Sequence, residues 1–478
     1  MYQYKIMSKV IGNNFTEMKQ KLDSVGCGFC LAKWTQVTMH LHDGTTHSCH
    51  HPAPHKIGLR ELKRNPTALH NSLQKKKARK EMLEGQRPSE CGYCWKVEDN
   101  SDSFSDRVFK SEEQWSKPHF KEIKDIHWKA DYLPKYVEAS FSNTCNFKCG
   151  YCGPSYSTQW VQEMKKHGEF STGDGFNSLE RLEKEDMVPI LQKDHNPYVE
   201  AFWKWWPELY KSMDTFRITG GEPLLSKDTF KVLDKIIETE TPNKKLKLSI
   251  NSNLCVDDKL IDRLIEKASV IINEKRVKEF IIYTSVDTYG EQAEFIRTGL
   301  DFKQLFDNID KILEKLPKVT IVVMSTFNIF SPFNYEKLVR KIYQHKLKHF
   351  NTERYWNSPI ILDTSYLRYP DFLSFRLLKG YLDISYFEKI EKYMKFFSSY
   401  RSLNSYDMQE INDSGFSLKE IEKISRIKDI FKEDEKSDVE FDIGKKKFKH
   451  YISDYKKRRD LDCYKTFPEL RKFINELK

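Results

Sequence analysis

The sequence predicts an α/β fold: a partial, TIM-like (β/α)6 barrel, preceded by a small cysteine-rich domain and followed by a mostly helical region. The first observation behind this prediction is an alternation of short β-branched and aromatic runs with amphipathic helical patterns along the middle of the chain. Such alternation is typical of parallel sheets, because adjacent parallel strands need a long crossover, usually a helix. The second observation is that the six units are too few to close a barrel of eight.

The strands of this middle part can be placed by residue number. They cover residues 136–141, 215–219, 246–250, 280–286, 318–324 and 359–362. Helical patterns between them include residues 228–238, 257–267 and 302–315. A long insertion, 154–214, separates the first two strands. The dense aromatic run near its end, 202–206, is expected to form core rather than to contact a substrate.

Length and composition set the domain organisation. A chain of 478 residues is long enough for two to three domains. We expect a cysteine-rich domain over residues 1–100, a linker over 101–132, the barrel over 133–365 and the helical region over 366–478. The chain is 31% charged, without a long apolar run or a secretory signal, which predicts a cytoplasmic protein with no membrane partner. Cysteines in that compartment stay reduced and more often bind metal than form disulfides.

The first group of cysteines lies in the N-terminal part of the chain. A predicted hairpin turn at Asp43-Gly44 brings Cys30 near Cys49, and Cys91-x2-Cys94 adds a knuckle further along. Four thiolates from a hairpin and a knuckle can form a closed zinc site or hold a complete iron–sulfur cube, and the residues do not separate these two possibilities. Cys27 is a spare ligand or a small buried residue.

The second group has the spacing Cys145-x3-Cys149-x2-Cys152 and follows the first predicted barrel strand directly. Three thiolates on one short loop can hold three corners of a four-iron cluster, and this leaves one iron open for chemistry. A partial zinc site or disulfides are the alternatives. Zinc usually takes its ligands as paired CxxC units, so the iron–sulfur interpretation is favoured for this loop.

A glycine-rich turn ends the next predicted strand, at the same end of the sheet. Gly220 and Gly221 permit close approach to the backbone, and Glu222 with nearby carbonyls can accept hydrogen bonds from a ligand ammonium group. Beside an open iron, such a turn predicts a site for an amino acid that chelates the metal through its amine and carboxylate.

These motifs resemble the radical SAM superfamily. The resemblance rests on Cys145, Cys149 and Cys152 with the aromatic Tyr151, on Gly220-Gly221-Glu222-Pro223, and on Ser285-Val286-Asp287. It implies a [4Fe–4S] cluster that binds S-adenosylmethionine (SAM), and one-electron cleavage of SAM to methionine and a 5′-deoxyadenosyl radical that abstracts a hydrogen atom from the substrate.

The resemblance also implies roles for individual residues. Tyr151, Val323 and Met324 would line the adenine pocket, and Gly220, Gly221 and Glu222 would hold the methionyl ammonium. Ser285 would contact the ribose with Asp287 nearby, Arg297 would pair with the methionyl carboxylate, and Asn251 would lie at the same rim.

The N-terminal cysteines resemble half of a SPASM domain, a twitch domain, which in relatives holds an auxiliary [4Fe–4S] cluster. Cys30, Cys49, Cys91 and Cys94 would then be its ligands. This resemblance implies an oxidoreductase or modifying enzyme that acts on a peptide or protein. It also implies a one-electron donor such as flavodoxin or ferredoxin.

Two other functions remain open at this point. The net charge of +10, a basic stretch over residues 60–87 and a basic end over residues 445–478 allow a nucleic acid or nucleotide as the substrate. Solvated helix faces, and a terminal helix that lies over the barrel, explain the same charges more simply. The third possibility is a non-enzymatic zinc-knuckle protein that binds nucleic acid.

Overall fold

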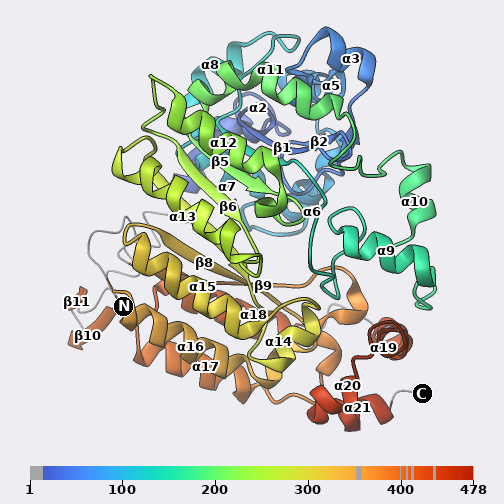
Figure 1. Cartoon of the computed structure of the whole chain (residues 1–478). Helices are drawn as coiled ribbons and strands as arrows, with labels where there is room; N and C mark the ends of the chain where they lie inside the picture. The colour runs from blue at the N-terminus through green and yellow to red at the C-terminus, as the bar shows by residue number, and fades with distance from the viewer. Residues whose placement is uncertain are drawn as a thin grey trace.

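The computed structural model describes residues 14–350, 358–398, 400–404, 407–410, 414–433 and 438–476. Its centre is a nine-stranded sheet in the order β3-β2-β1-β4-β5-β6-β7-β8-β9, with β3 and β9 at the two open edges (Figure 1). The six predicted strands are confirmed, and each pairs with the next in parallel: β4 (Tyr136–Ser140), β5 (Thr215–Thr219), β6 (Lys247–Asn251), β7 (Glu279–Ser285), β8 (Thr320–Phe327) and β9 (Ile360–Tyr366). The α/β class is therefore confirmed, while curvature into a partial barrel stays a prediction.

The N-terminal hairpin extends this sheet. β1 (Gln36–His40) pairs in parallel with β4, and β2 (Thr45–His47) returns antiparallel to β1, followed by the short β3 (His55–Lys56). The predicted hairpin is confirmed, with Gly44 at φ +76 in its turn. We expected this hairpin in a domain of its own, but Val37 and Met39 alternate with polar residues and are fully buried in the main core.

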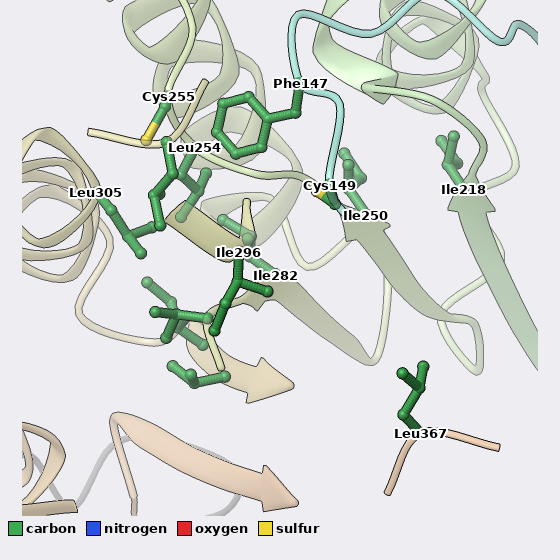
Figure 2. Close-up of a cluster of buried hydrophobic side chains, with 14 of the residues drawn as sticks. Phe147, Cys149, Ile218, Ile250, Leu254, Cys255, Ile282, Ile296, Leu305 and Leu367 are labelled. Atoms are coloured by element: carbon green, nitrogen blue, oxygen red, sulfur yellow. The ribbon is translucent and has the colours of Figure 1, made fainter. Parts of the chain in front are cut away.

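The two faces of the sheet differ in polarity. On one face, strand residues such as Val137, Ile218, Ile250 and Ile282 are fully buried, and Figure 2 shows several of them together with Phe147 of the cysteine loop. The helices that belong to this core are α12 (Lys227–Glu238), α13 (Asp258–Asn273), α14 (Glu291–Ile296), α15 (Phe302–Lys315) and α16 (Tyr335–Lys348). The opposite face carries polar side chains and is described with the candidate site.

The insertion contains α9 (Thr158–His167), α10 (Leu179–Lys184) and α11 (Pro197–Ser212). The predicted aromatic core is confirmed for α11, because Phe202, Trp205 and Trp206 are buried against the main core. Phe202 also stacks on Phe216 of β5, with ring centroids 6.1 Å apart. Helix α11 of the insertion therefore packs on the sheet.

A second, smaller core lies beneath the N-terminal helices. These helices are α2 (Ala32–Thr35), α5 (Leu73–Leu83), α6 (Gly92–Asn100), α7 (Asp106–Glu112) and α8 (Phe120–Asp125), whereas α3 (Leu59–Arg64) and α4 (Ala68–Asn71) place Leu62, Ala68 and Leu69 in the main core. Residues 101–132, which we expected as a linker, contain α7 and α8, and their Val108 and Ile123 are fully buried in this second core together with Trp34. The segment is thus packed against the cysteine-rich part.

The C-terminal region is mainly helical, as expected. Its helices are α17 (Ser385–Phe396), α18 (Leu418–Lys432), α19 (Asp438–Arg459), α20 (Cys463–Thr466) and α21 (Arg471–Asn475). It also contains an antiparallel pair that the helical prediction missed, β10 (Tyr400–Asn404) and β11 (Asp407–Glu410). In Figure 1, α19 to α21 lie together near α9 and α14, which favours the interpretation of a terminal helix that lies over the core. Among the described residues, no helix is both long and apolar enough to cross a membrane.

Candidate active site

The loop with three cysteines leaves the carboxyl end of β4 and lies partly buried. Its Cys149 is 9% exposed, and the apolar Phe147 of the same loop is anchored in the main core. Burial, and then the neighbouring thiolate of Cys149, raises the pKa of Cys152 to about 12. The pKa of Cys145 is raised by the same two causes. The three thiols therefore lie close enough to repel one another as thiolates, as ligands of one polynuclear centre must.

A buried ion pair lies directly beside this loop. The Asp287 carboxylate accepts hydrogen bonds from Arg297 Nε at 2.9 Å and from the Tyr151 hydroxyl at 2.8 Å, and Arg297 also donates to that hydroxyl. Another guanidinium nitrogen of Arg297 lies 3.8 Å from Cys149 Sγ. Burial alone would lower the pKa of Arg297, but the Asp287 carboxylate raises it well above its ordinary value. In the structure Arg297 pairs with Asp287, and its predicted contact with a ligand carboxylate stays a prediction.

The glycines of the next loop are required by close packing. A Cβ at Gly221 would lie 2.4 Å from Thr144 O, and one at Gly220 would lie 2.6 Å from Ser142 O. Gly220 also has φ +126, which side chains rarely adopt. In addition, Gly221 N donates to Ser142 O at 3.0 Å and Glu222 N donates to Thr144 O at 2.8 Å. These contacts hold the backbone of the glycine turn directly against the chain that leads into the cysteine loop.

The Glu222 side chain is directed at protein donors. Its carboxylate is 2% exposed and accepts from Leu224 N, Asn253 N and the Ser252 hydroxyl at 2.6–2.9 Å. Burial raises the pKa of Glu222 to about 7, against the opposing effect of these three donors. The predicted contact with a ligand ammonium stays a prediction. The structure shows that Glu222 ties the loop after β5 to the loop after β6.

The predicted adenine residues Val323 and Met324 lie on opposite faces of β8. Met324 is in register with Ser285 of β7, whereas Val323 is in register with Thr284, and both Val323 and Thr284 are fully buried. Successive side chains of a strand point to opposite faces. The expectation that both side chains line one pocket is therefore wrong: Met324 shares the polar face with Ser285, and Val323 packs in the core.

The polar face is organised around Arg217, which the sequence prediction missed. Arg217 Nε donates to Asn251 Oδ1 at 2.8 Å, and its guanidinium lies 4.1 Å from the ring centroid of Tyr283 and 3.9 Å from Glu138. The Met324 sulfur accepts from the same guanidinium at 3.3 Å. The available signal was a charged residue in the middle of a short predicted strand.

The same face continues onto β1. Thr38 is in register with Glu138, so Gln36, Thr38 and His40 lie on the side of Arg217. These three side chains are at least nine-tenths buried, and each has a polar atom with no hydrogen-bond partner among the described residues. Burial lowers the pKa of His40 to about 3, with His42 and His50 acting in the same direction. Buried polar groups of this kind need a partner, supplied by water or a ligand.

The four predicted N-terminal ligands converge on one pocket. Cys30, Cys49, Cys91 and Cys94 line it together with Lys33 and other side chains. Burial, followed by the thiolates of Cys49, Cys94 and Cys91, raises the pKa of Cys30 to about 12. Cys27 is exposed and lies outside this set. No three His, Cys, Asp or Glu groups within the described ranges surround a single metal-sized point.

Comparison with known proteins identifies the domain that carries the three-cysteine loop. Residues 139–331 match the family model of the Radical SAM superfamily, and the three-cysteine loop lies within the matched segment. The family implies a [4Fe–4S] cluster and SAM. The chemistry of the donor set agrees, since three thiols gather on one loop beside a buried cation.

The chain is similar to one curated relative and, at lower sequence identity, to solved structures. The GTP 3′,8-cyclase of Sulfurimonas denitrificans is 25% identical over 203 residues, which is 41% of this chain and 50% of the relative. The chain thus spans about half the length of this curated relative.

The solved structures are more distant. Native anSMEcpe with bound AdoMet and Cp18Cys peptide shares 17% identity, covers 54% of this chain and 57% of that chain, and has a TM-score of 0.31. Streptococcus suis SuiB bound to S-adenosylmethionine shares 13% identity, covers 68% and 59%, and has a TM-score of 0.32.

Proposed function

We propose that the chain is a radical SAM enzyme that abstracts a hydrogen atom from a peptide or protein. The observation that carries this proposal is the three-thiol loop of Cys145, Cys149 and Cys152 within a matched radical SAM domain. When bound there, the cluster supplies one electron to SAM, which is cleaved to methionine and a 5′-deoxyadenosyl radical. The remaining roles belong to side chains of this chain.

The side chains around the loop hold and orient the reactants. Arg297 places a fixed positive charge beside Cys149 Sγ, which favours the thiolate and stabilises a negatively charged cluster. Asp287 holds that guanidinium and the Tyr151 ring in place through its hydrogen bonds. Asn251 and Ser285 end β6 and β7 on the polar face, with Met324 of β8 in register with Ser285, and here we assign the nucleoside part of SAM.

The polar face supports a hydrogen-bonding substrate. Gln36, Thr38 and His40 offer donors and acceptors with no partner among the described residues, and a peptide backbone presents both kinds of group. The N-terminal thiol pocket would hold an auxiliary [4Fe–4S] cluster for electron transfer, because four thiolates leave no iron open for a substrate. A small one-electron carrier such as flavodoxin or ferredoxin would supply the electrons.

A nucleotide is the second candidate substrate. The curated GTP 3′,8-cyclase and the polar-face Arg217 favour it, because a guanidinium binds phosphate oxygens well. The basic stretch over residues 60–87 gives little support to a nucleotide substrate, because some of its charges are buried. Lys75 and Arg79 there are at most 1% exposed, and Arg79 donates to Asn71 Oδ1 at 2.8 Å rather than facing solvent. The radical SAM domain favours either enzyme over a non-enzymatic zinc-knuckle protein.

The test is SAM cleavage by anaerobically reconstituted, dithionite-reduced protein. We expect 5′-deoxyadenosine from the wild type and none above background from Cys149→Ala, measured by liquid chromatography and mass spectrometry. Wild-type protein that carries iron and sulfide but never cleaves SAM would refute the proposal. A mixed peptide digest and a nucleotide mixture containing GTP should then be compared for stimulation of the reaction. Stimulation by GTP alone would establish the second candidate instead.

A further inference from the structure

The backbone of the cysteine loop is held by side chains. Within the segment Phe147–Cys152, five carbonyl oxygens each accept a hydrogen bond from a side-chain donor. The bonds are Ser157 Oγ to Phe147 O at 2.5 Å, Arg459 Nη1 to Lys148 O at 2.6 Å, Trp160 Nε1 to Cys149 O at 2.9 Å, Tyr451 Oη to Gly150 O at 2.8 Å and Asn177 Nδ2 to Cys152 O at 2.8 Å. Because the loop has no regular secondary structure, these donors replace the partners that a helix or strand would supply.

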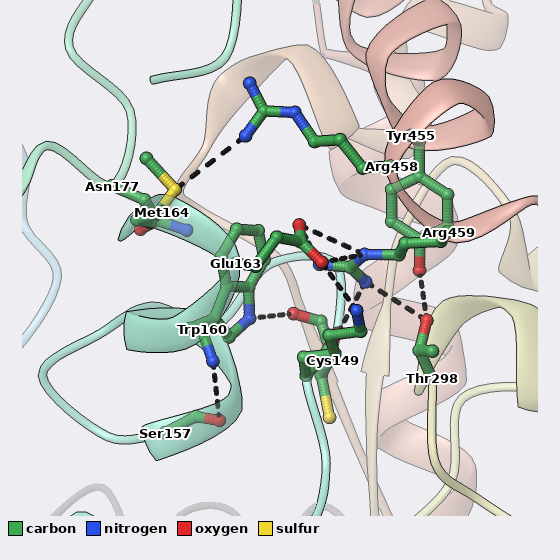
Figure 3. A network of polar contacts seen from close by, with 12 residues as sticks. Cys149, Ser157, Trp160, Glu163, Met164, Asn177, Thr298, Tyr455, Arg458 and Arg459 are labelled. Atoms are coloured by element: carbon green, nitrogen blue, oxygen red, sulfur yellow. Dashed lines mark hydrogen bonds and ion pairs between the residues drawn. The ribbon is translucent and has the colours of Figure 1, made fainter. Parts of the chain in front are cut away.

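The donors come from two segments that are distant in sequence from one another. Three belong to the insertion, and the other two, Tyr451 and Arg459, belong to α19. Figure 3 shows Arg459 of α19 beside Glu163 and the cysteine loop. Helix α19 lies outside residues 139–331, so the matched domain does not include it. The contact is close, because a Cβ at Gly150 would lie 2.7 Å from the Tyr451 hydroxyl.

Arg459 contacts several parts of the chain around the cysteine loop. Its side chain is fully buried and forms a bidentate ion pair with Glu163 of α9, with N–O distances of 3.0–3.3 Å. The same Glu163 accepts from Lys148 Nζ at 2.7 Å. Arg459 Nη1 also donates to the Thr298 hydroxyl at 3.1 Å. One guanidinium therefore connects α19, α9 and two loops around the cysteines.

Aromatic rings enclose the Arg459 guanidinium on its faces. It lies 4.6 Å from the ring centroid of Trp160 and 4.2 Å from that of Tyr455. A planar guanidinium with its edges hydrogen-bonded and its faces stacked has one available geometry. Lysine keeps the charge but does not reproduce the bidentate pair, so the position is sensitive to shape as well as to charge.

We propose that α19 is part of the cluster site and that Arg459 is a positioning residue for the cysteine loop. Together with Tyr451 it fixes the loop backbone, so that the three thiolates are held in the arrangement that binds the cluster. The inference rests on the proposed function only for the identity of the ligand; the immobilisation of the loop is a property of the chain itself.

The test uses four full-length variants. Arg459→Ala removes the guanidinium, Arg459→Lys keeps its charge, and Tyr451→Phe removes only the hydroxyl that donates to Gly150 O. Arg458→Ala is the matched control, because the neighbouring Arg458 donates to Gly168 O at 2.8 Å and to Glu169 O, outside the cysteine loop. Far-ultraviolet circular dichroism confirms that each variant is folded.

Two rates are then measured under anaerobic conditions. The first is amide hydrogen exchange over residues 145–152, and the second is loss of iron to a chelator from the reconstituted protein. Arg459→Ala should raise both rates about tenfold, equivalent to about 1.4 kcal/mol, the scale of one hydrogen bond to a charged group. Arg459→Lys and Tyr451→Phe should show smaller increases, and Arg458→Ala should match the wild type.

Unchanged exchange over 145–152 in Arg459→Ala would overturn the inference. Equal increases in Arg459→Ala and Arg458→Ala would also overturn it, because they would indicate general loosening of α19. Failure of the proposed function is a different result. In that case wild-type protein would hold no iron at the three cysteines, while the exchange difference between the two arginine variants would persist.

Discussion

The two groups of cysteines are held in place in different ways. Of the N-terminal four, Cys91 and Cys94 lie on a short helical turn and α6, and Cys30 and Cys49 lie just before α2 and just after β2, beside a small core of their own. The other three lie on an irregular loop, which is held by side chains from the insertion and from α19. The N-terminal group therefore lies beside short regular elements, whereas the three-cysteine loop depends on side chains from distant parts of the chain.

An ion pair lies beside each of the two groups of cysteines. Each has a buried cation paired with a carboxylate: Arg297 with Asp287 at the loop, and Lys33 with Glu90 at the N-terminal pocket. The difference lies in burial. Asp287 is fully buried, whereas the Glu90 side chain is 23% exposed, so solvent screens the second pair more strongly. The predictions below separate the two groups.

The largest effect is expected on iron content. If both groups hold four-iron cubes, the reconstituted protein should contain about eight irons per chain. Replacing Cys145, Cys149 and Cys152 by Ala should leave about four irons, and so should replacing Cys91 and Cys94. Iron and zinc are measured by elemental analysis. Zinc retained only by the N-terminal group would show that the two groups bind different metals.

Removal of each carboxylate should affect stability unequally. Asp287→Ala leaves the Arg297 charge buried without its partner, and we expect a loss of about 3–5 kcal/mol in the free energy of unfolding. Glu90→Ala also leaves a buried cation, Lys33, but water can reach the place of the 23% exposed carboxylate, so we expect a smaller loss of about 1–3 kcal/mol. Urea denaturation of the metal-free protein gives both values, and equal losses would contradict the difference in burial.

A pair of glycines tests the backbone packing of the two groups. Gly221→Ala places a Cβ against the backbone of the cysteine loop and should destabilise the protein by about 1–3 kcal/mol. A Cβ at Gly92, next to Cys91, would meet no atom of the described residues within 4 Å, and Gly92 has a helical φ of -54. Gly92→Ala should therefore be neutral or stabilise by about 0.4–1 kcal/mol. Thermal unfolding of the two variants should shift in opposite directions.

The two groups should also differ in pH dependence. The pKa of Glu222 is raised from 4.5 to about 7 by burial, so the folded state binds this proton more tightly than the unfolded state. Its contribution to stability should fall as pH rises between about 4.5 and about 7, by at most about 1.4 kcal/mol per pH unit.

Glu90 should show the opposite sign. Burial acts to raise the pKa of Glu90, but Lys33 lowers it overall, so its contribution is present above the unfolded pKa and lost as pH falls. Denaturation of Glu222→Gln and Glu90→Gln against the wild type across this range measures both slopes. Parallel slopes for the two variants would refute the assignment of opposite shifts.

Local patterns explain which parts of the fold were predictable. The six parallel strands follow from β-branched runs such as 280–286, and the turn at Asp43-Gly44 follows from its residue types. The pairing of β1 with β4 was missed because it joins strands about a hundred residues apart and leaves no local signal. The prediction that Val323 and Met324 share a pocket could have been avoided, because adjacent residues of a strand point to opposite faces of the sheet.

The sequence singles out the cysteine loop but gives no sign of the side chains that hold it. The spacing of Cys145, Cys149 and Cys152 indicates the cluster loop directly, because the chemistry requires thiolates at short intervals. Arg459 and Lys148 are 311 residues apart, and nothing local to Arg459 distinguishes it from the adjacent Arg458. Only the fold reveals which of the two contacts the loop.

The most direct test of the open site is electron paramagnetic resonance of the reduced protein with and without SAM. We predict that SAM changes the cluster signal in the wild type and in the variant lacking Cys91 and Cys94. We predict no SAM-dependent change in the variant lacking Cys145, Cys149 and Cys152. A SAM-dependent signal that persists without the loop cysteines, or disappears with the N-terminal pair, would contradict the assignment of the open site to the loop.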